Sequence, residues 1–329
     1  MSLVAEPRVA KLSPTAGYLS VQVELLHRLQ NSAVDLFVQY QPQREPVLYH
    51  RAGCPLESGQ ISKLTGASIS NIFVRSEDFQ TFGAHLLAEV DSLAASEQIP
   101  AAERFAVLQI AMAMEVERVA HLMDCGPFIY LAGTLAEKLT SILATSDVWP
   151  RDLFRLARHD YTTFTHVTNV AGYAVVLAER LGWCNGDDLN QIATAAILHD
   201  IGKRFIPTSI LTKPGKLNPE ERALIEEHPQ RGYEELCERC EVTFEQLMIV
   251  YQHHERLDGK GYPVGMRGDE IHPWARMLAV IDVFDAMTGM RSYRRPATAQ
   301  EAMDYIRKSS GTHFDPDVVQ CWDAAMSQK

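Results

Sequence analysis

The fold of this chain is decided by the stretch Ala195-Ala-Ile-Leu-His-Asp-Ile-Gly-Lys203. It ends a predicted helix that begins near Asp187 and carries apolar residues at helical spacing. Asp200 falls on the same inward face as these apolar residues. A carboxylate in an apolar core is costly unless it is paired, and a divalent cation is its strongest partner. The stretch therefore predicts a helical domain with a metal site.

Other predicted helices also bring histidine to an inward face. The capping sequence Asn218–Glu221 starts a helix on which His228 shares the side of the apolar residues. A helix from about Thr243 ends in His253 and His254. Because adjacent helical residues diverge by about 100 degrees, these two imidazoles suit two metal ions better than one.

Two further predicted helices add to this set. Asp282 and Asp285 lie three residues apart on an apolar helix, and His166 heads an apolar stripe upstream. Taken singly, His166 could be an ordinary core histidine, and Asp285 could cap a helix or pair with an arginine. Taken together, the helices indicate a multinuclear site. Imidazole and carboxylate without cysteine suit iron or manganese, with zinc as an alternative.

These residues carry a family resemblance. The sequences HDIGK at 199–203, HHERLDGKGYP at 253–263, RSYR at 291–294 and GTHFDP at 311–316 resemble an HD-GYP domain over roughly residues 150–325. The resemblance implies an all-helical metal-dependent phosphodiesterase that hydrolyses the bacterial second messenger cyclic di-GMP to pGpG, and often onward to GMP. The implied metal ligands are His166, His199, Asp200, His228, His253, His254 and Asp282, with Asp200 bridging two metals.

The resemblance also implies how the reaction proceeds. Metal-activated hydroxide would attack the phosphodiester, with Asp200 and Lys203 as the catalytic residues. Lys203 could instead be a solvated lysine at a helix end. The residues expected to contact the substrate are Lys203, Tyr262, Asp285, Arg291 and Arg294, where the two arginines hold the second phosphate and Tyr262 stacks on guanine.

One position departs from the trinuclear members of the family. Where they place a glutamate four residues before the first histidine ligand, this chain has Thr162. We therefore expect two divalent metal ions, iron or manganese, and no third. Asp160 lies close enough in sequence to keep a trinuclear centre as an alternative.

The charge balance limits the classes of partner. The chain carries 42 acidic and 31 basic residues, a formal net charge of −11, so long-range attraction cannot bring in an anionic substrate. Nucleic acid and anionic membranes are also disfavoured. No leader pattern or membrane-spanning apolar run is present, so we expect a cytoplasmic protein. The resemblance adds GGDEF-domain proteins as partners of the loop at 258–263.

The expected fold class is mainly α, with three parts. Alternating residues at 34–40 and apolar runs at 47–49 and 72–74 predict a small α+β domain over 1–80, whose signal the sequence does not reveal. A helical connector over 81–149 carries an apolar stripe that is either core or a homodimer interface. The HD-GYP domain occupies 150–329. The Cys237–Cys240 CxxC is interpreted as ordinary helix residues.

Two other functions stay open. The chain could be a receptor that binds cyclic di-GMP without hydrolysing it, although lost ligands would be the mark of a receptor and none is lost. It could also hydrolyse another cyclic dinucleotide such as cyclic GMP-AMP, or a nucleotide phosphate.

Overall fold

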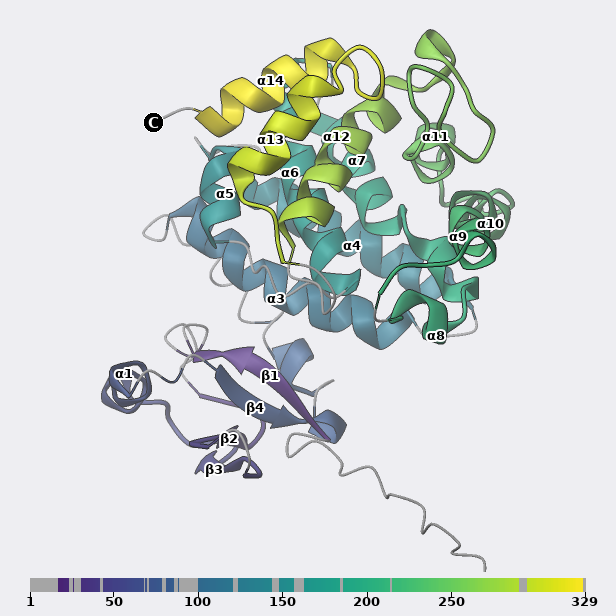
Figure 1. Cartoon of the computed structure of the whole chain (residues 1–329). Coiled ribbons are helices and arrows are strands. Elements are labelled where there is room, and N and C mark those ends of the chain that lie inside the picture. The colour runs from purple at the N-terminus through teal and green to yellow at the C-terminus, as the bar shows by residue number, and fades with distance from the viewer. Residues whose placement is uncertain are drawn as a thin grey trace, which may run out of the picture. The chain divides into compact units, whose positions relative to one another are not determined.

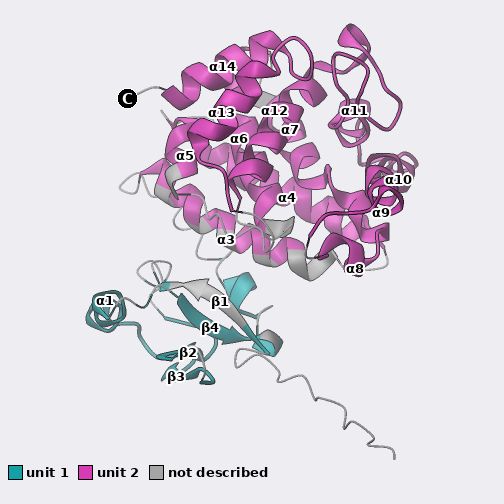
Figure 2. Ribbon diagram, viewed as in Figure 1, with its two compact units in different colours: residues 1–89 teal, residues 90–329 magenta. Residues whose placement is uncertain are grey.

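The chain forms two compact units, residues 1–89 and residues 90–329, shown in a computed structural model (Figure 2). The structure describes residues 17–23, 26, 31–41, 44–67, 69, 71–78, 81–85, 88, 100–120, 124–143, 148–156, 163–183, 186–213, 215–289 and 295–327. Thr162, Asp160, Arg291 and Arg294 lie outside the described residues.

The first unit is the expected small α+β domain. Its four-stranded antiparallel sheet has the order β1-β4-β2-β3, formed by β1 (Tyr18–Gln22), β4 (Asn71–Arg75), β2 (Leu36–Val38) and β3 (Val47–His50) (Figure 1). Helix α1 (Ser58–Gly66) lies between β3 and β4 in sequence, and η2 (Ser76–Asp78) follows β4. Alternate strand residues such as Ile72 and Val74 are fully buried, as period-two patterning requires.

The second unit is helical, as predicted (Figure 1). Its elements in chain order are α3 (Ala101–Ala120), α4 (Gly126–Leu143), α5 (Pro150–Leu156), α6 (Thr163–Leu181), α7 (Gly186–Leu198), η3 (Ile201–Phe205), α8 (Thr208–Leu211), α9 (Pro219–Glu226), α10 (His228–Leu236), α11 (Phe244–Gln252), η4 (Gly268–Glu270), α12 (Pro273–Thr288), α13 (Ala299–Lys308) and α14 (Pro316–Ser327). Among the described residues, no helix combines the length and apolarity needed to cross a bilayer.

Helix α12 is the core of the second unit. Leu278, Ile281 and Phe284 are fully buried, and the helix packs against α6, α11, α13 and α14. Helices α3 and α4 pack on α6 and α7, so residues 101–143 share this unit with the histidine-bearing helices. The division expected at residues 80 and 149 stays a prediction.

One predicted helix is divided in the structure. His228 was expected on the helix that starts at Asn218, and the capping box of Asn218 and Glu221 is indeed present. That helix, α9, ends at Glu226, and His228 begins α10 instead. Pro229 explains the break, because proline has no backbone N–H to donate to the carbonyl of Ile225, four residues before it.

Candidate metal centre

The structure brings all the predicted ligand positions to one place. His166 comes from α6, His199 and Asp200 directly follow α7, and His228 starts α10. His253 and His254 follow α11, and Asp282 lies on α12. Two groups have all their ligand atoms within 4.8 Å of one another, namely His228, His253 and His254 in the first group and His166, His199 and Asp200 in the second. His253 and His254 thus lie in one group, and not one in each as their expected divergence on a helix suggested.

The tautomers of three histidines are set by the backbone. Nδ1 of His199 donates to the Ala196 carbonyl at 2.6 Å, and Nδ1 of His228 donates to the Ile225 carbonyl at 2.7 Å. Nδ1 of His253 donates to the Val250 carbonyl at 2.9 Å. Since a neutral imidazole carries one proton, each Nε2 keeps its lone pair for the centre of the cluster. Metal-binding histidines are held in this way.

The lone pairs of two histidines face each other. Nε2 of His228 and Nε2 of His253 are 3.1 Å apart, and in both rings Nδ1 faces a backbone carbonyl. Burial, with the neighbouring His254 and His199 adding to it, holds the pKa of His253 well below its ordinary value. Burial also lowers the pKa of His254, to about 3. His253 and His254 therefore stay neutral, and a metal cation is the partner that fits the facing Nε2 atoms of His228 and His253.

Asp200 lies between the two groups. Its Oδ1 is 3.2 Å from Nε2 of His228, while its Oδ2 is 3.4 Å from Nε2 of His199 and 3.9 Å from Nε2 of His166. Burial opposes ionisation of Asp200, but Lys203 and the nearby histidines outweigh it, so the pKa of this carboxyl is well below its usual range. An ionised carboxylate with one oxygen toward each group has the geometry of a bridging ligand.

His166 lies between two carboxylates of α12, and each of its ring nitrogens contacts one of them. Its Nε2 is 3.0 Å from Oδ1 of Asp282, and its Nδ1 is 2.8 Å from Oδ2 of Asp285. Burial lowers the pKa of His166, but the hydrogen bonds to Asp282 and Asp285 outweigh this effect and raise the pKa to about 9. Without metal, His166 is an imidazolium that holds two acidic groups together.

Asp285 differs from its expected role. It was predicted to contact substrate, but it is 2% exposed, and its carboxylate binds Nδ1 of His166 and the Nδ2 amide of Asn169, the latter at 2.8 Å. Both carboxylate oxygens are thus occupied inside the protein. Asp285 therefore lies behind His166, in the position from which a carboxylate orients a metal-binding imidazole. Its three-residue spacing from Asp282 indicates only that both residues share one side of the helix, and it does not indicate the contact with His166.

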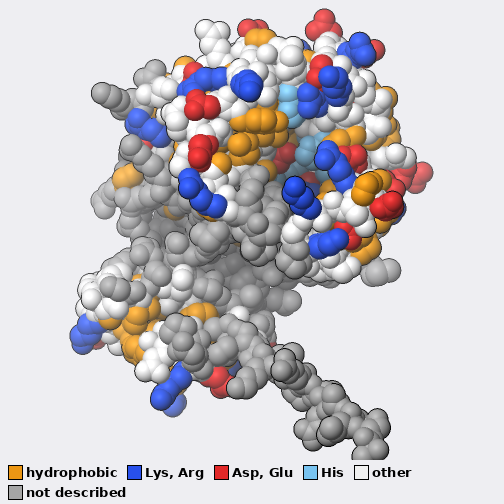
Figure 3. Space-filling model, viewed as in Figure 1, with side chains coloured by type: hydrophobic (Ala, Val, Ile, Leu, Met, Phe, Trp, Pro, Cys, Tyr) orange, Lys and Arg blue, Asp and Glu red, His pale blue; other side chains and the backbone are white. Residues whose placement is uncertain are grey.

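Lys203 and Tyr262 lie on the accessible side of the cluster. Nζ of Lys203, in η3, donates to Oδ2 of Asp200, and the lysine side chain is 22% exposed. The Tyr262 ring centroid is 4.7 Å from that of His254, whose side chain is also 22% exposed. In Figure 3, histidine side chains reach the surface of the helical unit beside basic side chains.

The loop that carries Tyr262 is fixed by Glu255, which sequence reasoning missed. The buried Glu255 carboxylate accepts hydrogen bonds from the backbone N–H groups of Val264, Gly265 and Met266. A Cβ on Gly261 would lie 2.5 Å from Cα of Glu255, so only glycine allows this close approach. The position of Glu255 directly after the histidine pair was the available signal.

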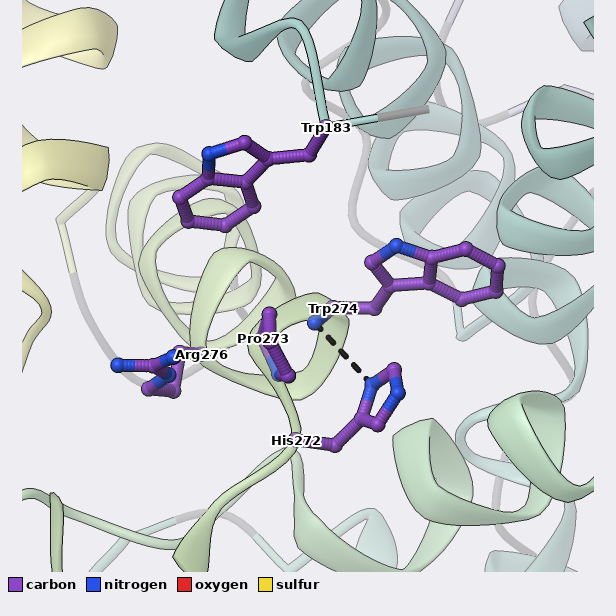
Figure 4. Close-up of a pocket in the computed structure, with 5 residues that line it drawn as sticks. All are labelled: Trp183, His272, Pro273, Trp274 and Arg276. Atoms are coloured by element: carbon purple, nitrogen blue, oxygen red, sulfur yellow. Dashed lines mark hydrogen bonds between the residues drawn. The ribbon is translucent and has the colours of Figure 1, made fainter. Parts of the chain in front are cut away.

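A different pocket lies at the start of α12. It has a volume of about 500 Å³ and is lined by Trp183, His272, Pro273, Trp274 and Arg276 (Figure 4). Nδ1 of His272 accepts the Trp274 N–H and thereby caps the helix. Arg276 pairs with Asp315 at 2.8 Å. None of the predicted ligands lines this pocket, so it is separate from the metal centre.

Comparison with known proteins defines the class. A sequence profile of the HD domain matches residues 134–318, more than half of the chain. The chain belongs to the HD domain family, and its His199-Asp200 and Gly261-Tyr262-Pro263 motifs place it among the HD-GYP proteins. The buried imidazole and carboxylate donors fit the divalent metal ions that such domains bind.

Three curated relatives are similar to part of the chain. A cyclic di-GMP phosphodiesterase of Pseudomonas aeruginosa is 39% identical over 175 residues, and the cyclic di-GMP phosphodiesterase response regulator RpfG of Xanthomonas campestris is 40% identical over 180 residues. Each match covers 53% of this chain but only 42% and 46% of the relatives. A 3'3'-cGAMP-specific phosphodiesterase of Vibrio cholerae is 39% identical over 167 residues, covering 49% of this chain and 32% of that relative.

The fold also matches a solved structure. Bd1817, an HDG"Y"P protein from Bdellovibrio bacteriovorus, matches with a TM-score of 0.70 at 18% identity. The match covers 94% of this chain and all of the other, so the likeness includes the small α+β unit as well as the helical unit.

Proposed function

We propose that this protein is a metal-dependent phosphodiesterase that hydrolyses cyclic di-GMP to pGpG and onward to GMP. The observation that carries the proposal is the pair of facing Nε2 atoms of His228 and His253, 3.1 Å apart, beside the shared carboxylate of Asp200. Relatives at 39% and 40% identity are named cyclic di-GMP phosphodiesterases, which supports the choice of substrate.

The centre is proposed to hold two divalent ions, iron or manganese. His228, His253 and His254 would hold one ion, and His166, His199 and Asp282 the other, with Asp200 between them. When bound, a pair of such ions activates water and neutralises charge on the scissile phosphate. Thr162 stands where trinuclear members of the family have a glutamate ligand, and this supports two ions rather than three.

The remaining chemistry falls to side chains on the accessible side. Lys203, beside Asp200, would contact the scissile phosphate and give a proton to the departing ribose oxygen. Tyr262 would stack on one guanine. Arg291 and Arg294, three residues apart, would hold the second phosphate by bidentate hydrogen bonds. In the same loop as Tyr262, the 57% exposed Val264 would give a GGDEF-domain partner an apolar contact.

Cyclic GMP-AMP is the second candidate substrate. Relatives named 3'3'-cGAMP-specific phosphodiesterases are 39% and 35% identical to this chain over 167 and 172 residues, so these identities do not separate the two dinucleotides. The two substrates share their phosphates and differ only in a base. Contacts to the bases therefore decide between them.

The test is anaerobic reconstitution with Fe²⁺ or Mn²⁺, followed by chromatography of products from cyclic di-GMP and from cyclic GMP-AMP. We expect pGpG and GMP from cyclic di-GMP at the higher kcat/KM. Faster cleavage of cyclic GMP-AMP would make that dinucleotide the substrate and leave the proposed reaction, phosphodiester hydrolysis, unchanged. A metal-loaded protein that binds cyclic di-GMP without product would be a receptor. Metal-free protein and Asp200→Ala serve as controls.

A further inference from the structure

A buried hydrogen-bonded chain joins helix α3 to the metal centre. Nε2 of Gln109 on α3 donates to Oδ1 of Asn169 on α6. Nδ2 of Asn169 donates to Oδ1 of Asp285 on α12 at 2.8 Å, and Nδ1 of His166 donates to Oδ2 of the same carboxylate at 2.8 Å. None of these side chains is more than 3% exposed.

The donors in this chain all point toward Asp285. The Gln109 N–H holds the oxygen of Asn169 on the α3 side, so the Asn169 N–H₂ faces the carboxylate. A reversed Asn169 amide would set its oxygen against Oδ1 of Asp285, and two acceptors repel. Gln109 therefore fixes the orientation of an amide that in turn fixes the carboxylate behind His166.

The backbone is built for this contact. A Cβ on Gly172 would lie 2.5 Å from the buried ring of Phe105, so α6 and α3 approach each other closely only because this residue is glycine. Gln109 follows Phe105 by one helical turn, and Asn169 precedes Gly172 by one turn. The close approach thus places the two amides within reach of each other.

Packing alone does not explain a glutamine at this position. Oε1 of Gln109 is buried and has no hydrogen-bond partner among the residues that the structure describes. A leucine of similar size would avoid this cost. Gln109 makes its side-chain hydrogen bond through the Nε2–H donor, and the acceptor of that bond is Oδ1 of Asn169.

We propose that Gln109 is a positioning residue for the metal centre: through Asn169 and Asp285 it holds His166 in its ligand orientation. Gln109 lies outside the HD-matched residues 134–318, on the first helix described after the 1–89 unit. The centre is thereby supported from α3, a helix outside the HD-matched residues. This inference rests on one part of the proposed function, namely that His166 binds a metal ion, and it does not depend on the substrate or the reaction.

The test measures Mn²⁺ dissociation constants by electron paramagnetic resonance on the full chain, independently of any nucleotide. Gln109→Leu should weaken binding roughly tenfold, the lower end for outer-shell partners of a metal site, and change the spectrum of bound Mn²⁺. The thermal midpoint of the metal-free protein should change little. Leu108→Ala, at the fully buried neighbouring position, is the matched control and should lower the midpoint while leaving the dissociation constant unchanged.

A double-mutant cycle decides whether Gln109 acts through Asn169. In an Asn169→Leu background, Gln109→Leu should have no further effect on Mn²⁺ affinity. Additive effects, or an equal loss of affinity in Leu108→Ala, would overturn the positioning role, as would a wild-type chain that binds no Mn²⁺. Tight Mn²⁺ binding without dinucleotide cleavage would defeat the proposed function and leave this inference standing.

Discussion

Nε2 of His166 lies 3.0 Å from Oδ1 of Asp282, with both groups buried and a second carboxylate behind the imidazole. The arrangement raises the pKa of His166 to about 9, because hydrogen bonds to Asp282 and Asp285 outweigh the effect of burial. His166 is also a predicted metal ligand, so its Nε2 carries a proton where a metal ion would bind. Without metal, this proton holds the centre together.

The pH dependence of the metal-free protein follows from this proton. The folded state binds it more tightly than the unfolded state, so its contribution to stability is full below pH 6.5 and is lost as the pH rises through about 9. At 1.36 kcal/mol per pKa unit the contribution is on the order of 3 kcal/mol. Thermal midpoints of metal-free wild type and His166→Gln should converge across this range. A constant difference between the two proteins from neutral pH to pH 10 would contradict the assignment.

Removing the shared carboxylate should empty the centre. In Asp200→Ala we expect loss of both metal ions and of cyclic di-GMP hydrolysis, because Asp200 has one oxygen toward each histidine group. The helical circular dichroism spectrum should be retained. Metal content after gel filtration is the measurement, and Glu238→Ala, at an exposed position, is the matched control. Retained stoichiometric metal would remove the bridging assignment.

Lys203→Met separates phosphate binding from proton transfer. If Lys203 protonates the leaving ribose oxygen, kcat for cyclic di-GMP should fall by roughly 10² or more. A substrate with a nitrophenolate leaving group needs no such proton and should lose far less. The two kcat values are compared on protein of verified metal content, since Lys203 also donates to Asp200. Equal losses on both substrates would show that Lys203 acts on the metal centre or on binding instead.

The contact of η3 with α10 requires glycine. A Cβ on Gly202 would lie 1.9 Å from the carbonyl oxygen of His228, so Gly202→Ala must push His199 and Asp200 away from His228. We expect a loss of more than about 3 kcal/mol in unfolding free energy, together with weaker metal binding. The control is Gly133→Ala in α4, where a Cβ meets nothing within 4 Å. That change should be neutral, or stabilising by about 0.5–1 kcal/mol. Similar unfolding free energies for the two variants would show that η3 can shift freely.

Much of the fold and the ligand set could be predicted because the signals are local. The capping box at Asn218 and Glu221, the apolar period before His199 and the paired His253 and His254 are each signals within a few residues, and local periodicity predicts the helices that end just before these histidines. The charge balance likewise follows from composition. These features gave the mainly helical class and the positions that meet in the structure.

Other features depend on which helices pack together, and a single sequence carries no signal for that. Asp285 lies 119 residues from His166, and Gln109 lies 60 residues from Asn169, so their hydrogen bonds exist only after α3, α6 and α12 have met. The sequence by itself determined which side chains could bind metal. The tertiary structure decided that the Nε2 lone pairs converge and that Asp285 supports His166, because distances between side chains on separate helices are set by packing.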